Sequence, residues 1–224
     1  MVEHLMGNNY AFLLGKISTP LEYSHSMYGE GFYVFKLAVP RLSDYIDMLP
    51  VTVSERLLDG LDMSVGNEIG VEGQLRSYNK YIDGGNRLIL TVFARDIYLK
   101  REESHNPNQI ILEGYICKKP IYRITPFKRE ITDMLLAVNR PYNKSDYIPC
   151  IAWGRNARFS EGLNVGQQIK VWGRIQSREY QKKMPDGEII TKVAYEVSIS
   201  KMEIPNPVIK EEAWNSLNQY KTNG

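Results

Sequence analysis

Residues 168–187 read QIKVWGRIQSREYQKKMPDG, and this stretch decides the fold. Ile169, Val171 and Ile175 alternate with basic, polar and aromatic side chains, so one face of the stretch is apolar and the other is cationic. A period of two is typical of a β-strand with one buried face. The Asp-Gly pair at the end tolerates positive φ angles, so we expect a long strand that returns as a hairpin.

A related pattern occurs about 100 residues earlier in the chain. Residues 73–75, GQL, correspond to residues 173–175, GRI, and Val65-Gly66 corresponds to Val165-Gly166. Three further pairs keep the order at offsets of 99 to 103, namely Leu14–Ile17 with Glu113–Ile116, Leu37–Arg41 with Leu136–Arg140, and the Asp83-Gly84 turn with the Asp186-Gly187 turn. Five ordered pairs indicate a tandem duplication.

Each copy is predicted to consist mostly of strands. In the second copy, five stretches rich in Ile, Val, Tyr and Trp are separated by turn residues: 109–117, 134–138, 148–153, 168–181 and 188–200. A helix-like interval at residues 155–163 falls between the third and fourth strands, where the first copy has residues 54–63. This layout is that of the OB-fold, a small Greek-key barrel that binds oligonucleotides or oligosaccharides.

We therefore predict a mainly all-β chain with two tandem OB-folds, each a five-stranded Greek-key barrel with one short helix. The first copy is expected at residues 8–101 and the second at residues 108–204, with a short charged linker between them. Residues 205–224 are expected to form a polar tail. A length of 224 residues suits two domains of about 100 residues each.

The composition argues against membrane and secreted classes of protein. The chain is 43% hydrophobic and 24% charged with a mean hydropathy of −0.36, and no stretch approaches the roughly 18 apolar residues of a membrane helix. The first ten residues lack the basic start and apolar run of a signal peptide, so a cytoplasmic protein is expected. Cys117 and Cys150, the two cysteines, are expected to be free thiols.

No metal site, cofactor or catalytic centre is expected. His4, His25 and His105 are scattered and form no ligand cluster with the cysteines. The sequence lacks a G-x-x-x-x-G-K-[ST] phosphate loop, an H-E-x-x-H helix and a G-x-S-x-G elbow. Some nucleases use this fold, so an enzyme is the less favoured alternative.

Charge is divided unevenly between the copies. Residues 1–104 contain 10 Lys and Arg against 14 Asp and Glu, whereas residues 105–224 contain 18 against 12. A polyanion is therefore expected to prefer the second copy.

The cationic face of the strand near residue 175 interleaves basic and aromatic side chains. This pattern suits single-stranded nucleic acid, because Lys and Arg neutralise phosphates while aromatic rings stack on unpaired bases. The candidate residues on this face are Trp172, Arg174, Arg178, Tyr180 and Lys182. The alternative is a solvated hairpin face whose Trp and Tyr pack on a neighbouring subunit.

Further candidates lie before the predicted helix and in the first copy. Tyr147 and Trp153 share one face of a regular strand and Arg155 follows, although Trp153 alternatively caps the core. The first copy has Glu72 at the position of Trp172, and its remaining candidates are Arg76, Tyr78 and Lys80. We therefore hypothesise divided labour, with the second copy as the main binder and the first serving assembly or a partner.

Four segments in order resemble the bacterial single-stranded DNA-binding protein family. They are NQIILEGYI at 108–116, LAV at 136–138, DYIPCIAWGRNA at 146–157 and VWGRIQSR at 171–178, and residues 8–100 resemble a diverged member. The resemblance implies base stacking on Tyr142, Tyr147, Trp153 and Tyr180. It also implies binding of single-stranded DNA with little sequence preference in DNA replication, recombination or repair.

The same resemblance implies an assembly. Members of the family generally present four OB-folds, so two per chain imply a homodimer. Members that organise replication usually end in a Gly/Pro/Gln-rich tail with an acidic tip that recruits other proteins, whereas this chain ends NQYKTNG. The alternatives are a primosomal or restart accessory that contacts replication or restart proteins through the first copy, and an OB-fold scaffold for protein interactions.

Overall fold

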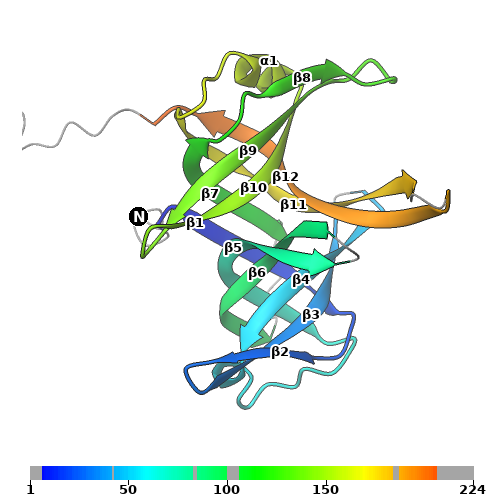
Figure 1. Cartoon of the computed structure of the whole chain (residues 1–224). Coiled ribbons are helices and arrows are strands. Elements are labelled where there is room, and N and C mark those ends of the chain that lie inside the picture. The colour runs from blue at the N-terminus through cyan, green and yellow to red at the C-terminus, as the bar shows by residue number, and fades with distance from the viewer. Residues whose placement is uncertain (1–6, 42, 83–84, 100–105, 184–186, 206–224) are drawn as a thin grey trace, which may run out of the picture.

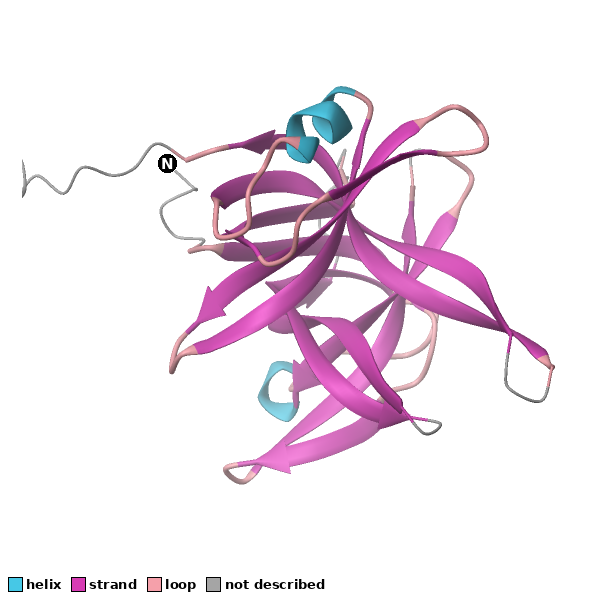
Figure 2. Ribbon diagram, turned by 45° about the horizontal axis from the view of Figure 1, so that its top comes forward, coloured by secondary structure: helices cyan, strands magenta, loops and turns pink. Residues whose placement is uncertain are grey.

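The computed structural model consists mainly of β-strands, arranged as one barrel above another (Figures 1 and 2). It describes residues 7–41, 43–82, 85–99, 106–183 and 187–205, without the side chains of residues 182 and 183. The 83–84 turn, Asp186, most of the linker and nearly all of the tail lie outside the described residues.

The two halves of the chain contain matching elements. The first half has β1 (Asn9–Ile17), β2 (Glu22–Met27), β3 (Glu30–Pro40), β4 (Ile46–Ser54), the 3₁₀ turn η2 (Glu55–Leu57), β5 (Glu68–Ile82) and β6 (Gly85–Leu99). The second half has β7 (Asn108–Ile116), β8 (Ile121–Ile124), β9 (Glu130–Arg140), β10 (Lys144–Trp153), α1 (Arg155–Glu161), β11 (Gln168–Lys183) and β12 (Ile189–Glu203).

The strands form one continuous sheet whose order is symmetric about its middle. The order is β2-β3-β4-β6-β5-β1-β7-β11-β12-β10-β9-β8, and the pairings of β1 with β3 and of β7 with β9 close each half into a barrel. Strands β1 and β7 join the barrels as antiparallel neighbours, with Ala11 opposite Ile110 at the centre of their register. Since residues 11 and 110 are equivalent positions of the repeat, the two copies are related by an approximate two-fold axis.

Glycine allows each barrel to close. A Cβ on Gly15 would lie 2.4 Å from the Ala38 carbonyl oxygen, and a Cβ on Gly114 would lie 2.4 Å from the Ala137 carbonyl oxygen. Both strands therefore need glycine where the first strand of each barrel meets the third.

The apolar faces of the strands fill the barrel interiors. The fully buried side chains occur as repeat pairs, such as Leu13 with Leu112 and Leu37 with Leu136. Burial of a Leu or Ile side chain contributes about 1.5–3 kcal/mol, so this set is the main stabilising term of each barrel. The expected apolar side of the long strand, Ile169, Val171 and Ile175, is buried as predicted.

The prediction of a mainly all-β chain with two OB-folds is confirmed, but the described residues form six strands in each half rather than five. The prediction of a helix in the first copy is wrong. Only the single turn η2 forms there, and Gly60 follows with a φ of +71°, a left-handed conformation that ends a right-handed helix. In the second copy α1 forms and buries Ala157 and Ser160.

Candidate functional site

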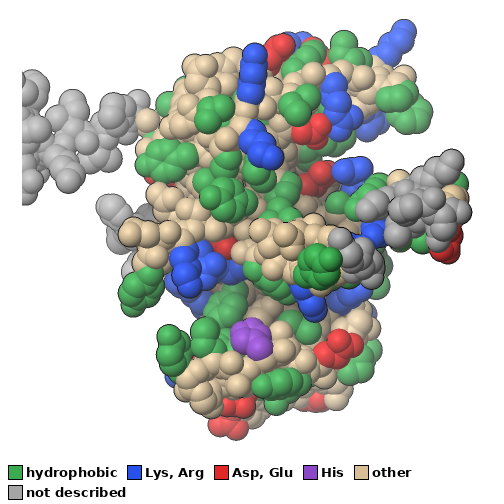
Figure 3. Space-filling model, viewed as in Figure 1, with side chains coloured by type: hydrophobic (Ala, Val, Ile, Leu, Met, Phe, Trp, Pro, Cys, Tyr) green, Lys and Arg blue, Asp and Glu red, His purple; other side chains and the backbone are tan. Residues whose placement is uncertain are grey.

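A groove on the second copy collects the strongest candidates, and we name it the Trp153 groove. Its volume is about 610 Å³. Its lining includes Trp153, one carboxylate, Glu196, and five arginines: Arg41, Arg123, Arg129, Arg174 and Arg178. This excess of positive charge favours an anionic ligand. Basic side chains also gather at the waist between the two halves of the molecule (Figure 3).

Strand β11 places two of these arginines on one face. Arg174 and Arg178 follow the period of two, since Ile175 between them points into the barrel. A register shift between Trp172 and Gly173 inserts Ser200 as an extra residue in β12, so the alternation along β11 is unbroken. Arg174 and Arg178 therefore lie on the predicted cationic face. Gln176 stands between them on this face but is buried, and its Nε2 donates a 2.9 Å hydrogen bond to Glu196.

Trp153 ends β10 and lies over the floor of the groove. Its indole Nε1 donates a hydrogen bond to Ser198 Oγ of β12 at 3.2 Å, and 36% of the residue is exposed. The hydrogen bond fixes the ring while part of its surface faces the groove. Such a held, partly exposed ring can stack on a planar ligand.

Arg174 is the arginine with an unmet hydrogen-bonding atom. Among the described residues, nothing accepts a hydrogen bond from its buried Nε. A buried unpaired donor costs about 1–3 kcal/mol, so Arg174 is held ready to gain from an anion that approaches its guanidinium. Arg174 also lines a neighbouring depression together with Pro107 and Ser200, so it stands where the Trp153 groove and this depression meet.

Three arginines of the groove were missed by sequence reasoning. Arg123 and Arg129 flank the turn between β8 and β9, where Phe127 is 87% exposed. The mixture of basic and aromatic residues at 122–129 was the available signal. Arg41 belongs to the first copy, and its position over the second copy depends on how the barrels dock.

Arg41 is held by a buried carboxylate. Its Nε and Nη2 donate to the two oxygens of Asp47 at 2.7 and 2.8 Å, and the backbone N–H and hydroxyl of Ser177 in the second copy donate to Asp47 Oδ1. Burial alone would raise the pKa of Asp47, but these bonds hold it below the ordinary range of an aspartate. Asp47 thus links the two copies and fixes the position of the Arg41 guanidinium.

The other predicted second-copy residues are spread around the groove. Tyr180 lies further along the same hairpin, with the Arg178 guanidinium 6.0 Å from its ring. Trp172 lies outside the groove, and the Lys170 and Lys201 ammonium groups are 4.9 and 4.1 Å from its ring. Arg155 is exposed at the start of α1. The side chain of Lys182 lies outside the described residues.

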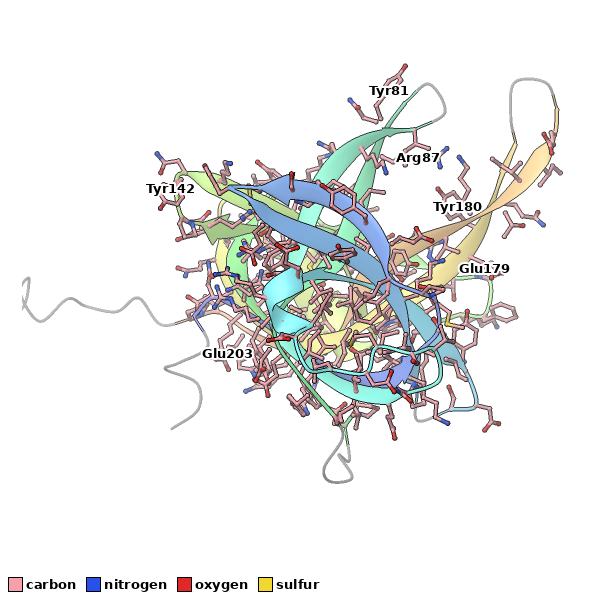
Figure 4. All side chains as sticks on the ribbon, turned by 90° about the horizontal axis from the view of Figure 1, so that it is seen from below. Tyr81, Arg87, Tyr142, Glu179, Tyr180 and Glu203 are labelled. Carbon is pink, nitrogen blue, oxygen red and sulfur yellow. The ribbon has the colours of Figure 1, made fainter. Side chains whose placement is uncertain are left out.

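Two predicted tyrosines are not brought to the Trp153 groove. Tyr142 is 94% exposed in the turn between β9 and β10, on the opposite side of the molecule from Tyr180 (Figure 4). Tyr147 sits at the junction of the copies, where its backbone N–H donates to Ser77 Oγ at 2.7 Å.

The first-copy candidates line a separate groove of about 570 Å³, which we name the Phe93 groove. Its lining includes Arg76, Tyr78, Lys80, Phe93, His25 and Arg140. Arg76 Nη1 is 3.0 Å from Asp146 Oδ2 of the second copy, so it also joins the two barrels. Tyr78 is 46% exposed, and Lys80 is exposed on the long β5–β6 hairpin.

Neither cysteine has the surroundings of a nucleophile. Burial raises the pKa of the Cys150 thiol and, to a lesser degree, that of Cys117, and both thiols are free. No group of three or more metal-ligating side chains occurs in the part of the chain that the structure describes. Over the same residues, the structure contains no helix long and apolar enough to span a membrane.

The second copy is similar to known DNA-binding proteins. The model of the single-strand binding protein family matches residues 107–205. Single-stranded DNA-binding protein 1 of Streptococcus pyogenes is 31% identical over 96 residues, which cover 40% of this chain and 74% of that protein. The single-stranded DNA-binding protein of Clostridium tetani is 32% identical over 93 residues, 38% of this chain and 64% of that protein.

The fold of both copies matches a solved structure. The wild-type single-stranded DNA binding protein from Thermus aquaticus superposes with a TM-score of 0.70 at 23% identity, over 88% of this chain and 93% of that one. The N-terminal domain of a PriB protein from Thermoanaerobacter tencongensis is 53% identical over 42% of this chain, with a TM-score of 0.37. This chain spans 64% and 56% of the Clostridium protein and of Bacillus subtilis protein A.

Proposed function

The chain belongs to the single-strand binding protein family, and from this premise we propose that it binds single-stranded DNA with little sequence preference through its second copy. The observation that carries the proposal is the Trp153 groove, where a held indole ring stands among five arginines. Rings stack on every base and guanidinium groups contact every phosphate, so such a groove discriminates weakly between sequences.

The path of the strand follows β11. Tyr180, Arg178, Arg174 and Trp172 lie on the same face of this strand at even positions. A single strand laid along them meets a ring at each end and two guanidinium groups between the rings, and Trp153 adds a ring from β10. Tyr142, Tyr147, Arg155 and Lys182 are proposed as contacts beyond the groove, and Arg76, Tyr78 and Lys80 as contacts on the first copy.

Two observations favour nucleic acid over the scaffold alternative. The groove is strongly cationic, with five arginines against the single carboxylate of Glu196. Arg174 Nε lacks a partner among the described residues, as expected of a side chain that completes its bonding with a ligand. A protein-binding face would instead need a predominantly apolar centre.

The proposal has further parts that the family membership supports. We propose that the protein protects single strands during replication, recombination or repair, that it has no catalytic activity, and that it acts in the cytoplasm, where bacterial DNA lies. We also propose a homodimer, by analogy with assemblies of four OB-folds. Restart or replication proteins are proposed as additional partners.

The test is the affinity of the full chain for a labelled dT oligonucleotide, measured by fluorescence anisotropy. Trp153→Ala should weaken binding by about 1–3 kcal/mol, the stacking energy of one base. Phe159→Ala is the matched control, because Phe159 is an exposed ring on α1 that lines neither groove. Equal affinities of Trp153→Ala and the wild-type protein would refute stacking in this groove.

A further inference from the structure

We infer that molecules bound to one single strand contact each other head to tail, with the β2 edge of one molecule docked on the β8 edge of the next. The partner is a second copy of this chain. The inference rests on the proposed function, because the bound strand brings the molecules together. The contact differs from the proposed homodimer, since it joins two different surfaces and leaves a free edge at each end of the row.

Strands β2 and β8 are the two ends of the continuous sheet. The strand order begins with β2 and ends with β8, and among the described residues each is paired with a single strand, β3 or β9. They lie at opposite ends of the molecule (Figure 1). An unpaired edge presents backbone N–H and C=O groups that can pair with a strand of another chain.

The register of β8 shows which backbone groups face outward. The Thr125 N–H donates to the Arg129 carbonyl oxygen at 2.9 Å, so these two residues form a hydrogen-bonded pair. By the alternation of antiparallel strands, the N–H and C=O groups of Tyr122 and Ile124 point away from β9. Ile121 and Ile124 are 64% and 62% exposed, so the edge also offers apolar side chains.

Strand β2 presents a matching edge. Met27 and Glu30 are paired across a two-residue turn whose residues both have positive φ, so they form the hydrogen-bonded pair that closes a tight hairpin. The next residue, Ser26, therefore has its N–H and C=O groups directed away from β3. All six residues of β2 are exposed, including the apolar parts of Tyr23 and Met27.

Charge decides which edges meet. Residues 18–31, which contain β2, include two Glu and no Lys or Arg. The equivalent residues 117–130, which contain β8, include five Lys and Arg and one Glu. Two β8 edges repel each other, as do two β2 edges, whereas a β2 edge attracts a β8 edge. The contact is therefore heterologous, and its repetition forms an open row of molecules.

The contact also brings the grooves of neighbouring molecules together. The lining of the Trp153 groove includes three residues of β8 and the turn after it, Arg123, Thr125 and Arg129. The lining of the Phe93 groove includes three residues of β2, Ser24, His25 and Met27. When β2 docks on β8, these two groove margins adjoin. A single strand that leaves the second copy of one molecule then meets the first copy of the next.

A weak contact is sufficient for this role. Strand β8 has four residues, and a register shift at Ser24 interrupts the pairing of β2, so the ladder between the two edges is short. Molecules held on one strand experience an effective concentration on the order of millimolar. A contact too weak to join molecules in free solution therefore joins neighbours on the strand.

The test compares labelled dT oligonucleotides of about 30 and about 150 nucleotides on the full chain. Two OB-folds cover at most about 30 nucleotides, so the short length holds one binding unit and the long length holds several. At low protein, the wild type should fill some long oligonucleotides while others stay bare, as counted by mass photometry. This distribution measures the cooperativity of binding.

Two variants attack the contact in different ways. Ser26→Pro removes an outward N–H without removing a ladder bond to β3, and Glu22→Lys reverses the charge of the β2 edge. Both residues lie outside the linings of the two grooves. Each variant should lower the cooperativity about tenfold and leave the affinity for the short oligonucleotide unchanged. Unchanged short-length affinity also shows that the variant is folded.

Asp96→Lys is the matched control for Glu22→Lys, because Asp96 is exposed on β6, outside both grooves and both edges. It should keep the wild-type cooperativity. Independent filling of the long oligonucleotide by the wild type, or wild-type cooperativity in both Ser26→Pro and Glu22→Lys, would overturn the contact and leave the proposed function standing. Failure of the wild type to bind the short oligonucleotide would overturn the proposed function as well.

Discussion

The Trp153 groove and the Phe93 groove are built on the same barrel positions but with different side chains. The Trp153 groove has one aromatic side chain, Trp153 on β10, and five arginines. The Phe93 groove has Phe93 on β6 and Tyr78 on β5, with two arginines, one lysine and a histidine. The comparison shows that both grooves have an aromatic ring in their lining, although Trp153 and Phe93 stand on different strands of the barrel.

The two aspartates that link the copies also have different arginine partners. Asp47 binds one arginine through both oxygens, while Asp146 lies between Arg76 and Arg140. Each aspartate also accepts a backbone hydrogen bond at 2.7 Å from a serine of the opposite copy, Ser177 or Ser77. The two-fold relation is therefore kept by the serines and aspartates, while the arginines have been redistributed.

The largest effect is expected from Asp47→Ala. It leaves Arg41, whose side chain is 19% exposed, without its partner and removes the acceptor of the Ser177 N–H. Breaking a buried pair by removing one member costs about 3–5 kcal/mol, so the free energy of unfolding in urea should fall by about 3 kcal/mol. A loss below about 1 kcal/mol would mean that the junction is not held by this carboxylate.

Acidification should narrow the difference in the free energy of unfolding between wild type and Asp47→Ala. The folded-state pKa of Asp47 is lowered, so its contribution is complete above the unfolded value of about 3.9 and is lost as pH falls through the folded pKa. Urea unfolding at pH 7 and below pH 4 measures this. A gap that widens on acidification would contradict the assigned direction of the pKa shift.

Mutation can move the aromatic ring of the Trp153 groove from β10 to the neighbouring strand β12, which is the equivalent of the strand that carries Phe93 in the first copy. Trp153→Ser should weaken dT binding by about 1–3 kcal/mol, and the added change Ser198→Phe should recover most of the loss, because it gives the groove the ring arrangement of the first copy. Anisotropy titrations at one salt concentration make the comparison. If the double variant binds no better than Trp153→Ser, ring position matters and the grooves are not equivalent.

The smallest effect is expected when one arginine of the Trp153 groove is removed, and it appears in the salt dependence of binding. Arg129 lines the Trp153 groove, and its counterpart in the first copy is Glu30. Arg129→Ala should lower the slope of log affinity against log salt by about 1, the signature of one lost phosphate contact. Lys16→Ala removes an exposed lysine outside both grooves and should leave the slope unchanged. Equal slopes for the wild type and Arg129→Ala would place Arg129 outside the phosphate path.

Much of the fold was predictable, because the buried face of each long strand repeats with a period of two in both copies. Strand β2 was missed since all six of its residues are exposed and show no apolar alternation. The helix expected in the first copy stops after the single turn η2, and Gly60, two residues beyond the cap Leu58, has a left-handed φ that a pattern of apolar residues does not reveal. Local sequence predicts elements that face a core and is less informative at edges.

The site was predictable only where one strand carries it. Arg174 and Arg178 follow from the alternation of β11, and Trp153 from its place at the end of a strand. Arg41 reaches the groove from the other copy, where it donates a hydrogen bond to the carbonyl oxygen of Ser177. These residues are 136 positions apart, so no local pattern predicts their contact. Phe93 lines its groove from β6 whereas Trp153 lines its groove from β10, so a comparison of equivalent positions in the repeat does not pair the two rings.

The central claim, that single-stranded DNA stacks on Trp153, is tested most directly by the fluorescence of that residue alone. In a full-length Trp172→Phe, Trp214→Phe variant, Trp153 is the sole tryptophan. Titration with dT should quench its emission saturably, with reversal by salt and no response to duplex DNA. An unchanged Trp153 emission while anisotropy reports binding of the same oligonucleotide would contradict the account.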